Sequence, residues 1–115
     1  MADEMKLVER GLVFSGEDQV AERLGRLEPG DLLVGFSSRG MIELRRVSEF
    51  AYAVELYDFR SRISHIMRRP LKLSGVPLAL RVVLEDAKGG HVAGYEFAVF
   101  KRLTPNRGGD VSCSR

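Results

Sequence analysis

The sequence has little of the chemistry that binds metals or forms covalent cross-links. It holds one cysteine and two histidines among 115 residues. A single cysteine excludes a disulfide framework within the chain, and it also excludes a cysteine-rich zinc site. His65, His91 and Cys113 stand far apart in the sequence, whereas a zinc or transition-metal site needs three or four converging ligands, usually with short local spacings. We therefore expect neither a metal nor another cofactor.

Long apolar segments are also lacking. No apolar run approaches the roughly 20 residues that a membrane-spanning helix needs. The first six residues are Met-Ala-Asp-Glu-Met-Lys, which lack the charged-then-apolar order of a signal peptide. We therefore expect a cytoplasmic protein that does not bind membranes.

Catalytic and nucleotide-binding signatures are missing as well. The sequence contains neither G-x-x-x-x-G-K-S/T nor G-x-G-x-x-G, and the glycine pairs at 89–90 and 108–109 do not open a predicted helix. Adjacent carboxylates such as Glu17 and Asp18 do not face each other, and Cys113 has no neighbouring base. We therefore rank an enzyme below the two kinds of binding protein that are described below, and we expect no catalytic residues.

What is present fits an ordinary globular domain. Hydrophobic residues make up 44% of the chain and charged residues 30%. A chain of this length buries enough apolar surface for a core without cross-links. We expect a single domain over residues 1–104, followed by a flexible tail over residues 105–115, because that segment is polar and rich in glycine.

One helix is predicted with clear start and stop residues. Ser15 is a typical N-cap, and acidic residues follow it in the first turn, where the helix dipole favours them. Apolar residues then recur at helical spacing, and Pro29 and Gly30 cannot continue the helix. The sequence therefore predicts a helix over residues 16–27.

Strands are predicted on both sides of this helix. Gly11 interrupts the first strand, and a glycine within a strand often marks a β-bulge. The turn-forming residues 37–40 separate the next two strands, as in a hairpin. The predicted strands cover residues 6–14, 31–36 and 41–47.

Residues 41–69 contain neither glycine nor proline, so periodicity alone predicts the next elements. Alternating apolar residues predict a strand over residues 49–57. Apolar residues at helical spacing then predict a helix over residues 59–68, with Asp58 as its N-cap. The alternative is a single helix over residues 49–68, since the alanines and leucine in this segment tolerate a helix.

The clearest predicted hairpin spans residues 77–101. Two runs rich in β-branched and aromatic residues flank a segment that ends in a pair of glycines. We expect residues 80–84 to pair with residues 92–97. The first strand covers residues 76–84, the turn residues 85–90 and the second strand residues 91–100.

The predicted element order is therefore β-α-β-β-β-α-β-β. Consecutive strands combined with two helices are typical of an α+β fold with a mainly antiparallel sheet. Many short strands in a small chain also curl readily. We predict a small mainly antiparallel β-sheet, or a partly open barrel, capped by two helices.

Charge is unevenly distributed along the chain. Residues 1–58 hold 12 acidic and 7 basic residues, whereas residues 59–115 hold 4 acidic and 11 basic ones. Arginine outnumbers lysine 14 to 4, and its planar guanidinium group binds phosphates and base edges bidentately. A GC-rich genome would produce the same ratio. The asymmetry bears on the partners of the protein rather than on its fold.

The basic residues predict a nucleic-acid interface. On the predicted helix, Arg62 and Arg69 share a face, beside Ser61 and His65, and form a stripe that could follow phosphates. The alternative is a solvated helix face balanced by the acidic first half. The predicted nucleic-acid-binding residues are Arg60, Arg62, Arg68, Arg69, Lys72, Lys101 and Arg102.

An aromatic pair adds to this interface. Tyr95 and Phe97 share one face of a predicted strand, with Lys101 and Arg102 beyond them. Exposed aromatic side chains beside arginines form a stacking platform for unpaired bases. The alternative is that both rings belong to the core.

Residues 28–34, Glu-Pro-Gly-Asp-Leu-Leu-Val, resemble a segment of small RNA-binding barrels of the PUA and ASCH kind. The resemblance implies RNA rather than duplex DNA as a partner. Our first hypothesis is therefore a non-enzymatic module that binds RNA or single-stranded nucleic acid. The alternative is a protein-interaction subunit or homodimeric scaffold of a larger intracellular complex. One continuous positive face would favour the first, and positive patches neutralised by acidic residues would favour the second.

Overall fold

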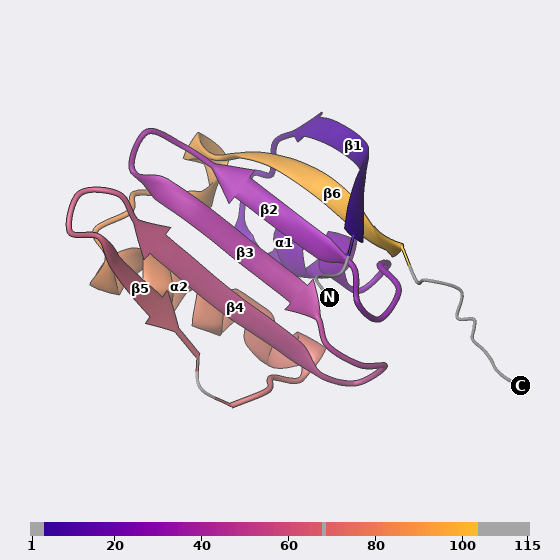
Figure 1. Cartoon of the computed structure of the whole chain (residues 1–115). Coiled ribbons are helices and arrows are strands. Elements are labelled where there is room, and N and C mark those ends of the chain that lie inside the picture. The colour runs from indigo at the N-terminus through magenta and orange to yellow at the C-terminus, as the bar shows by residue number, and fades with distance from the viewer. Residues whose placement is uncertain (1–3, 68, 104–115) are drawn as a thin grey trace, which may run out of the picture.

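The computed structural model describes residues 4–67 and 69–103 of the chain. Six strands form one sheet in the order β1-β6-β2-β3-β4-β5, and all neighbouring strands are antiparallel (Figure 1). The strands are β1 (Glu4–Leu12), β2 (Leu32–Phe36), β3 (Gly40–Arg46), β4 (Tyr52–Asp58), β5 (Ile63–Ile66) and β6 (Glu96–Leu103). The helices are α1 (Glu17–Leu24) and α2 (Val76–Asp86), with 3-10 turns η1 (Leu73–Gly75) and η2 (Val92–Gly94).

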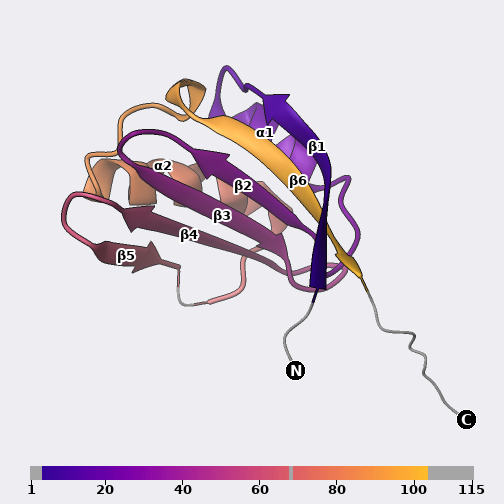
Figure 2. The ribbon, with the colours of Figure 1, turned by 45° about the horizontal axis from the view of Figure 1, so that its top comes forward.

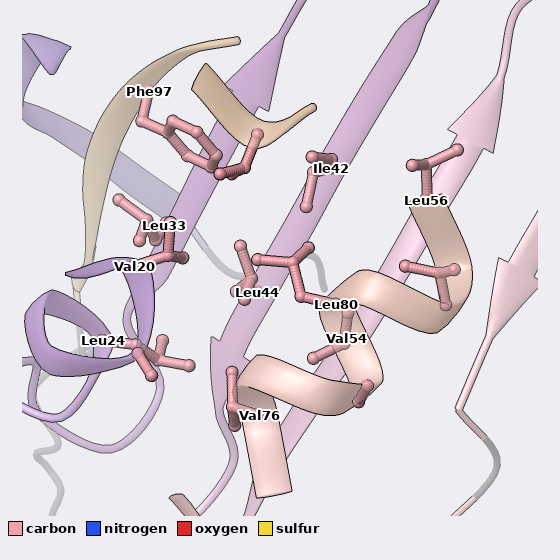
Figure 3. Close-up of a cluster of buried hydrophobic side chains, with 14 of the residues drawn as sticks. Val20, Leu24, Leu33, Ile42, Leu44, Val54, Leu56, Val76, Leu80 and Phe97 are labelled. Atoms are coloured by element: carbon pink, nitrogen blue, oxygen red, sulfur yellow. The ribbon is translucent and has the colours of Figure 1, made fainter. Parts of the chain in front are cut away.

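Both α-helices lie against the same face of the sheet (Figures 1 and 2). Alternate strand residues point to that face, and side chains such as Ile42 and Val54 pack with Leu24 of α1 and Leu80 of α2 (Figure 3). These four side chains are fully buried, and each contributes about 1.5–3 kcal/mol through burial. Among the described residues, no helix lies on the opposite face.

The α+β class and the antiparallel sheet are as the sequence predicts, but the sheet is not closed into a barrel. β1 and β5 are its two edges. β1 is irregular, as its glycine indicated: its pairing with β6 shifts register on both sides of Glu9. Gly11 has a φ of +76°, which costs glycine nothing. The bulges strengthen the local twist of this edge strand.

The predicted first helix is confirmed as α1, although α1 is shorter. It ends at Leu24, with Gly25 as its C-cap, before the predicted end at residue 27. Its N-cap is Gly16 rather than Ser15. The Ser15 main-chain N–H instead donates to Oε1 of Gln19, at 2.8 Å, so a side chain from the first turn reaches back to the start of the helix.

The strand predicted over residues 49–57 is confirmed as β4, so the alternative of one helix over residues 49–68 is wrong. The helix predicted over residues 59–68 is also wrong. Residues 59–62 form a tight turn, and the chain returns as β5.

Asp58 is the physical reason for this turn. Its Oδ1 accepts a hydrogen bond from the Arg60 N–H at 3.0 Å, and its Oδ2 accepts one from the Ser61 hydroxyl at 2.8 Å. Its carbonyl oxygen accepts the Arg62 N–H at 2.8 Å. Asp58 thus caps a turn instead of a helix, and Arg62 takes a left-handed φ of +62° that ends any helical path.

The hairpin predicted over residues 77–101 is wrong as well. Residues 76–86 form α2, and β6 pairs with β1 and β2 rather than with residues 80–84. Buried residues in α2 recur at helical spacing, at Val76, Leu80, Val83 and Leu84. Pro77 lies in the first turn, where its missing N–H costs no hydrogen bond. Packing of this apolar stripe on the sheet outweighs the strand preference of its valines.

Two predictions fall outside the described residues, namely the flexible tail over residues 105–115 and the position of Cys113. Within the described residues, neither helix has the length and apolar character that crossing a membrane requires.

Candidate functional site

The predicted basic residues do not form one stripe. Arg60 and Arg62 lie in the turn between β4 and β5. Arg69 and Lys72 follow β5 at the other end of the sheet, where Leu71 forms a bridge with Tyr52. Because β5 is a strand, Arg62 and Arg69 lie beyond its opposite ends and share no helix face. Arg68 lies outside the described residues.

Lys101 and Arg102 of β6 are engaged by acidic residues of the first half of the chain. The Lys101 ammonium group lies 2.7 Å from Oε1 of Glu28 and 3.9 Å from Oδ2 of Asp31. The hydrogen bond with Glu28 raises the pKa of Lys101, and the same contact lowers the pKa of Glu28. The main-chain N–H of Arg102 donates to Oδ1 of Asp31 at 3.1 Å. The ion pairs of Lys101 therefore partly neutralise this positive patch.

Tyr95 and Phe97 belong to the core and do not form an exposed stacking platform. Their exposed fractions are 2% and 0%. The Tyr95 hydroxyl donates to the Gly89 carbonyl at 2.9 Å, and the Phe97 ring packs edge-on against Phe14, with 5.1 Å between centroids. Gly35 makes room for Phe97, because a Cβ there would lie 2.6 Å from its ring.

The sheet face opposite the helices carries an apolar surface that the sequence analysis did not identify. Cross-strand partners share a face, so the register groups these side chains, with Phe100 between Leu7 and Leu32 and with Val34 beside Ala98. We call this surface the open face. Its apolar members are Leu7, Leu32, Val34, Phe36, Met41, Tyr57, Ile66, Ala98 and Phe100.

The open face combines exposed and shielded apolar side chains. Leu7, Phe36 and Ile66 are 45%, 46% and 56% exposed. Val34 and Ala98 are buried although no described helix lies over them. A hollow of about 440 Å³ lies over β1, β6 and the end of β2, and it is lined by Leu7, Phe36, Ala98 and Phe100 together with Arg10 and Glu96. The open face is therefore a shaped surface on which apolar side chains lie beside charged ones.

Two carboxylates face each other in the middle of the open face. Glu43 of β3 and Glu55 of β4 are direct cross-strand partners, and both are half-buried. Arg45 reaches Glu43 at 3.4 Å. Within the described part of the chain, Glu55 has no ion pair. Like charges directly opposite each other destabilise a sheet, so a cation arriving from outside would be favourable here.

A signal for the open face was present in the sequence. The β2 segment Leu-Leu-Val-Gly-Phe and the β6 segment Phe-Ala-Val-Phe are apolar at every non-glycine position. Such runs are typical of strands whose two faces are both buried. In this fold the helices bury only one face.

Among the described residues, no group of three or more histidine, cysteine or acidic side chains could hold a metal ion. His65 is half-buried on the helix side of β5, opposite Leu56, and His91 is exposed in the loop after α2.

Similarity to proteins of known function is a second source of information about what a protein does. We compared the chain with protein-family models, with curated proteins and with solved structures, and none of them matches.

Proposed function

We propose that this protein is a non-enzymatic, cytoplasmic interaction module whose open face binds a segment of a partner protein. The observation that carries the proposal is the apolar character of β2 and β6 on both faces, with helices on only one of them. Contiguous apolar patches on a protein surface typically mark interaction sites. The hollow beside β1 offers a place for one large apolar side chain.

The charges on the open face favour a basic partner. Glu55, which stands opposite Glu43, would accept an ion pair from a lysine or arginine placed among apolar residues of that partner, whereas Arg45 already reaches Glu43. A second copy of this chain fits less well, because two open faces in contact would bring both glutamate pairs into one interface. The proposed ligand is therefore a protein segment with large apolar side chains and at least one basic residue.

Nucleic-acid binding remains a prediction, but the helix that was expected to carry it is absent. The charges on the open face are also mixed, because Arg45 pairs with Glu43 and because Arg10 and Glu96 line the same hollow, whereas a phosphate track needs a continuous positive surface. Binding of RNA or single-stranded DNA is therefore one of the outcomes that the following test separates.

The test is a selection of random peptides displayed on phage against the folded protein, followed by affinity measurements with synthetic peptides. We expect enriched peptides to combine large apolar residues with lysine or arginine. The double variant Leu7→Ser, Phe36→Ser should weaken their binding by about tenfold or more, since these side chains line the hollow. Glu55→Gln should weaken peptides with a basic residue more than their neutral analogues.

Leu78→Ser is the matched control. Leu78 is 63% exposed on α2, on the helix side of the sheet, and its replacement should leave peptide affinity unchanged. Equal loss in the control, or the absence of enriched peptides, would contradict the proposal. A salt-sensitive affinity for oligonucleotides alone would replace it with nucleic-acid binding, and a dimeric mass in light scattering that Phe36→Ser abolishes would replace it with self-association.

A further inference from the structure

Three loops that are far apart in the sequence meet at one end of the sheet. They are the β2–β3 turn at Ser37–Arg39, the β4–β5 turn at residues 59–62, and the loop at residues 88–91 that follows α2. Two adjoining hollows of about 270 and 310 Å³ lie among these loops. Because Ser38 and Arg39 line both hollows, we treat them as one feature and call it the loop-end hollow.

Three cationic side chains line the loop-end hollow. Arg39, Arg60 and Lys88 surround its larger part, and each comes from a different loop. Within the described residues, none of the three forms an ion pair. The one carboxylate in this wall is Asp58, whose two oxygens already accept hydrogen bonds from the turn that it caps. Asp58 keeps its own negative charge, which acts on Arg60, so the wall carries three positive charges against one negative charge.

The loops that carry these cations are tied to one another. Arg39 donates from Nη1 to the Lys88 carbonyl at 3.1 Å, and its own carbonyl accepts the Phe59 N–H at 3.0 Å. The Tyr95 hydroxyl donates a hydrogen bond to the Gly89 carbonyl, which fixes the third loop to the core. Arg39 also passes over Gly90, where a Cβ would lie 3.5 Å from its Nη1. These contacts hold the guanidinium group of Arg39 and the backbone of the loops that carry Arg60 and Lys88, so Arg39 in particular loses little freedom when an anion binds.

Neutral hydrogen-bond donors line the smaller part of the hollow. The Nδ1 atom of His91 accepts the Ala93 N–H at 3.1 Å, so the ring proton of neutral His91 is on Nε2. That Nε2–H is a donor, and Ser37 and Ser38 line the same part of the hollow, where Oγ of Ser37 accepts the Arg39 main-chain N–H at 3.0 Å. The backbone of Gly89 and Gly90 completes the wall without side chains.

We propose that the loop-end hollow binds the phosphoryl group of a phosphate monoester. Arginine and lysine from three loops converge on one small volume, which suits a single doubly charged group rather than a polynucleotide backbone. Of the other predicted basic residues that are described, Arg62 lies in the same β4–β5 turn. Lys72 and Lys101 lie at the far end of the sheet and cannot extend the site into a track. None of the three cations lines the open-face hollow, so the inference stands independently of the proposed interaction module.

The experiment follows amide resonances of the labelled protein during titrations at constant ionic strength. The probes are inorganic phosphate, adenosine monophosphate, and a short oligothymidylate with and without a 5′-phosphate. We expect saturable shifts at Ser38, Lys88 and Gly90 with the three probes that carry a monoester or free phosphate. The oligonucleotide without a terminal phosphate should bind about tenfold more weakly or worse.

Variants assign the effect to the cations. Arg60→Ala keeps the Asp58 cap, because that cap uses the main-chain N–H of Arg60. Lys88→Asn removes a charge but suits the left-handed φ of +52° at this position. Each should raise the apparent Kd for phosphate by about fivefold or more. Lys72→Ala, an exposed lysine at the far end of the sheet, is the matched control and should leave the Kd unchanged.

Three results would overturn the proposal. The first is a phosphate response that does not saturate. The second is an equal loss of affinity in Lys72→Ala and Arg60→Ala, which would indicate a general charge effect. The third is equal affinity for the two oligonucleotides, which would indicate recognition of the diester backbone. None of these three results would contradict peptide binding to the open face.

Discussion

The two buried carboxylates of the described chain both organise loops. Asp31 accepts main-chain N–H groups from Glu28 and Arg102, at 3.1 Å each, and so fastens the loop before β2 to the end of β6. Asp58 accepts hydrogen bonds within the turn after β4. A buried carboxylate must be hydrogen-bonded to remain charged, and here the partners are groups that the turns would otherwise leave unsatisfied.

Asp58 gives a prediction about acid stability. The Ser61 hydroxyl and then the Arg60 N–H lower the pKa of this carboxyl below its ordinary value. A lowered folded-state pKa contributes stability above the unfolded-state pKa, and that contribution is lost as the pH falls through the folded-state value. We predict that the Tm of Asp58→Asn falls less than the Tm of the wild type when the pH is lowered from about 5 to about 2.

At pH 7, Asp58→Ala should lower the Tm by several degrees, and by more than Asp58→Asn, which keeps one acceptor oxygen. Thermal melts followed by circular dichroism measure both effects. Asp86→Asn, an exposed aspartate at the end of α2, is the control. The same acid sensitivity in the wild type and in Asp58→Asn would show that another carboxylate controls unfolding in acid.

Among the elements, those with decisive local chemistry could be predicted and those without it could not. α1 has acidic residues in its first turn and a glycine at its end, and β4 alternates cleanly. Residues 76–86, in contrast, fit both periods, because valines and leucines fill the strand-like positions as well as the helical stripe. Only packing against β4 and α1 distinguishes the two, and packing depends on contacts distant in sequence.

The second misassigned element shows the same limit. Phe59, Ile63, Ile66 and Met67 have helical spacing, but Asp58 closes a turn that starts β5 instead. The predicted position of the candidate site was wrong for the same reason, because Arg62 and Arg69 would share a surface only on a helix. The open face was missed for a related reason: which face of a sheet stays uncovered depends on where both helices pack.

A pair of variants tests the helical state of α2 directly. In a strand, Leu80 and Val82 would point to the same face, whereas in α2 Leu80 is fully buried and Val82 is 36% exposed. We predict that Leu80→Ala lowers the free energy of unfolding by about 2–5 kcal/mol. Val82→Ala should cost well under half as much. Denaturant melts measure both, and equal losses would contradict the helix.

At the scale of the whole molecule, stability should decline from the middle of the sheet to its β5 edge. β3 pairs with a strand on each side, whereas β5 has four residues and pairs only with β4. We predict that native-state hydrogen exchange protects Ile42 and Leu44 most strongly, and protects His65 and Met67, whose N–H groups face β4, at least about tenfold less. Comparable protection in β3 and β5 would mean that the sheet opens only by global unfolding.

The pairing of β1 with β6 also determines how the chain could be rewired. Glu4 and Leu103 are direct cross-strand partners, so the described chain enters and leaves the sheet at one corner (Figure 2). Directly opposite Cα atoms in an antiparallel pair lie only about 5 Å apart. A linker of a few residues would therefore join these two positions, and new termini could be opened between Val47 and Ala51, in the turn that joins β3 to β4. Such a circular permutant would retain every strand pair of the sheet while changing the order in which the strands are synthesised.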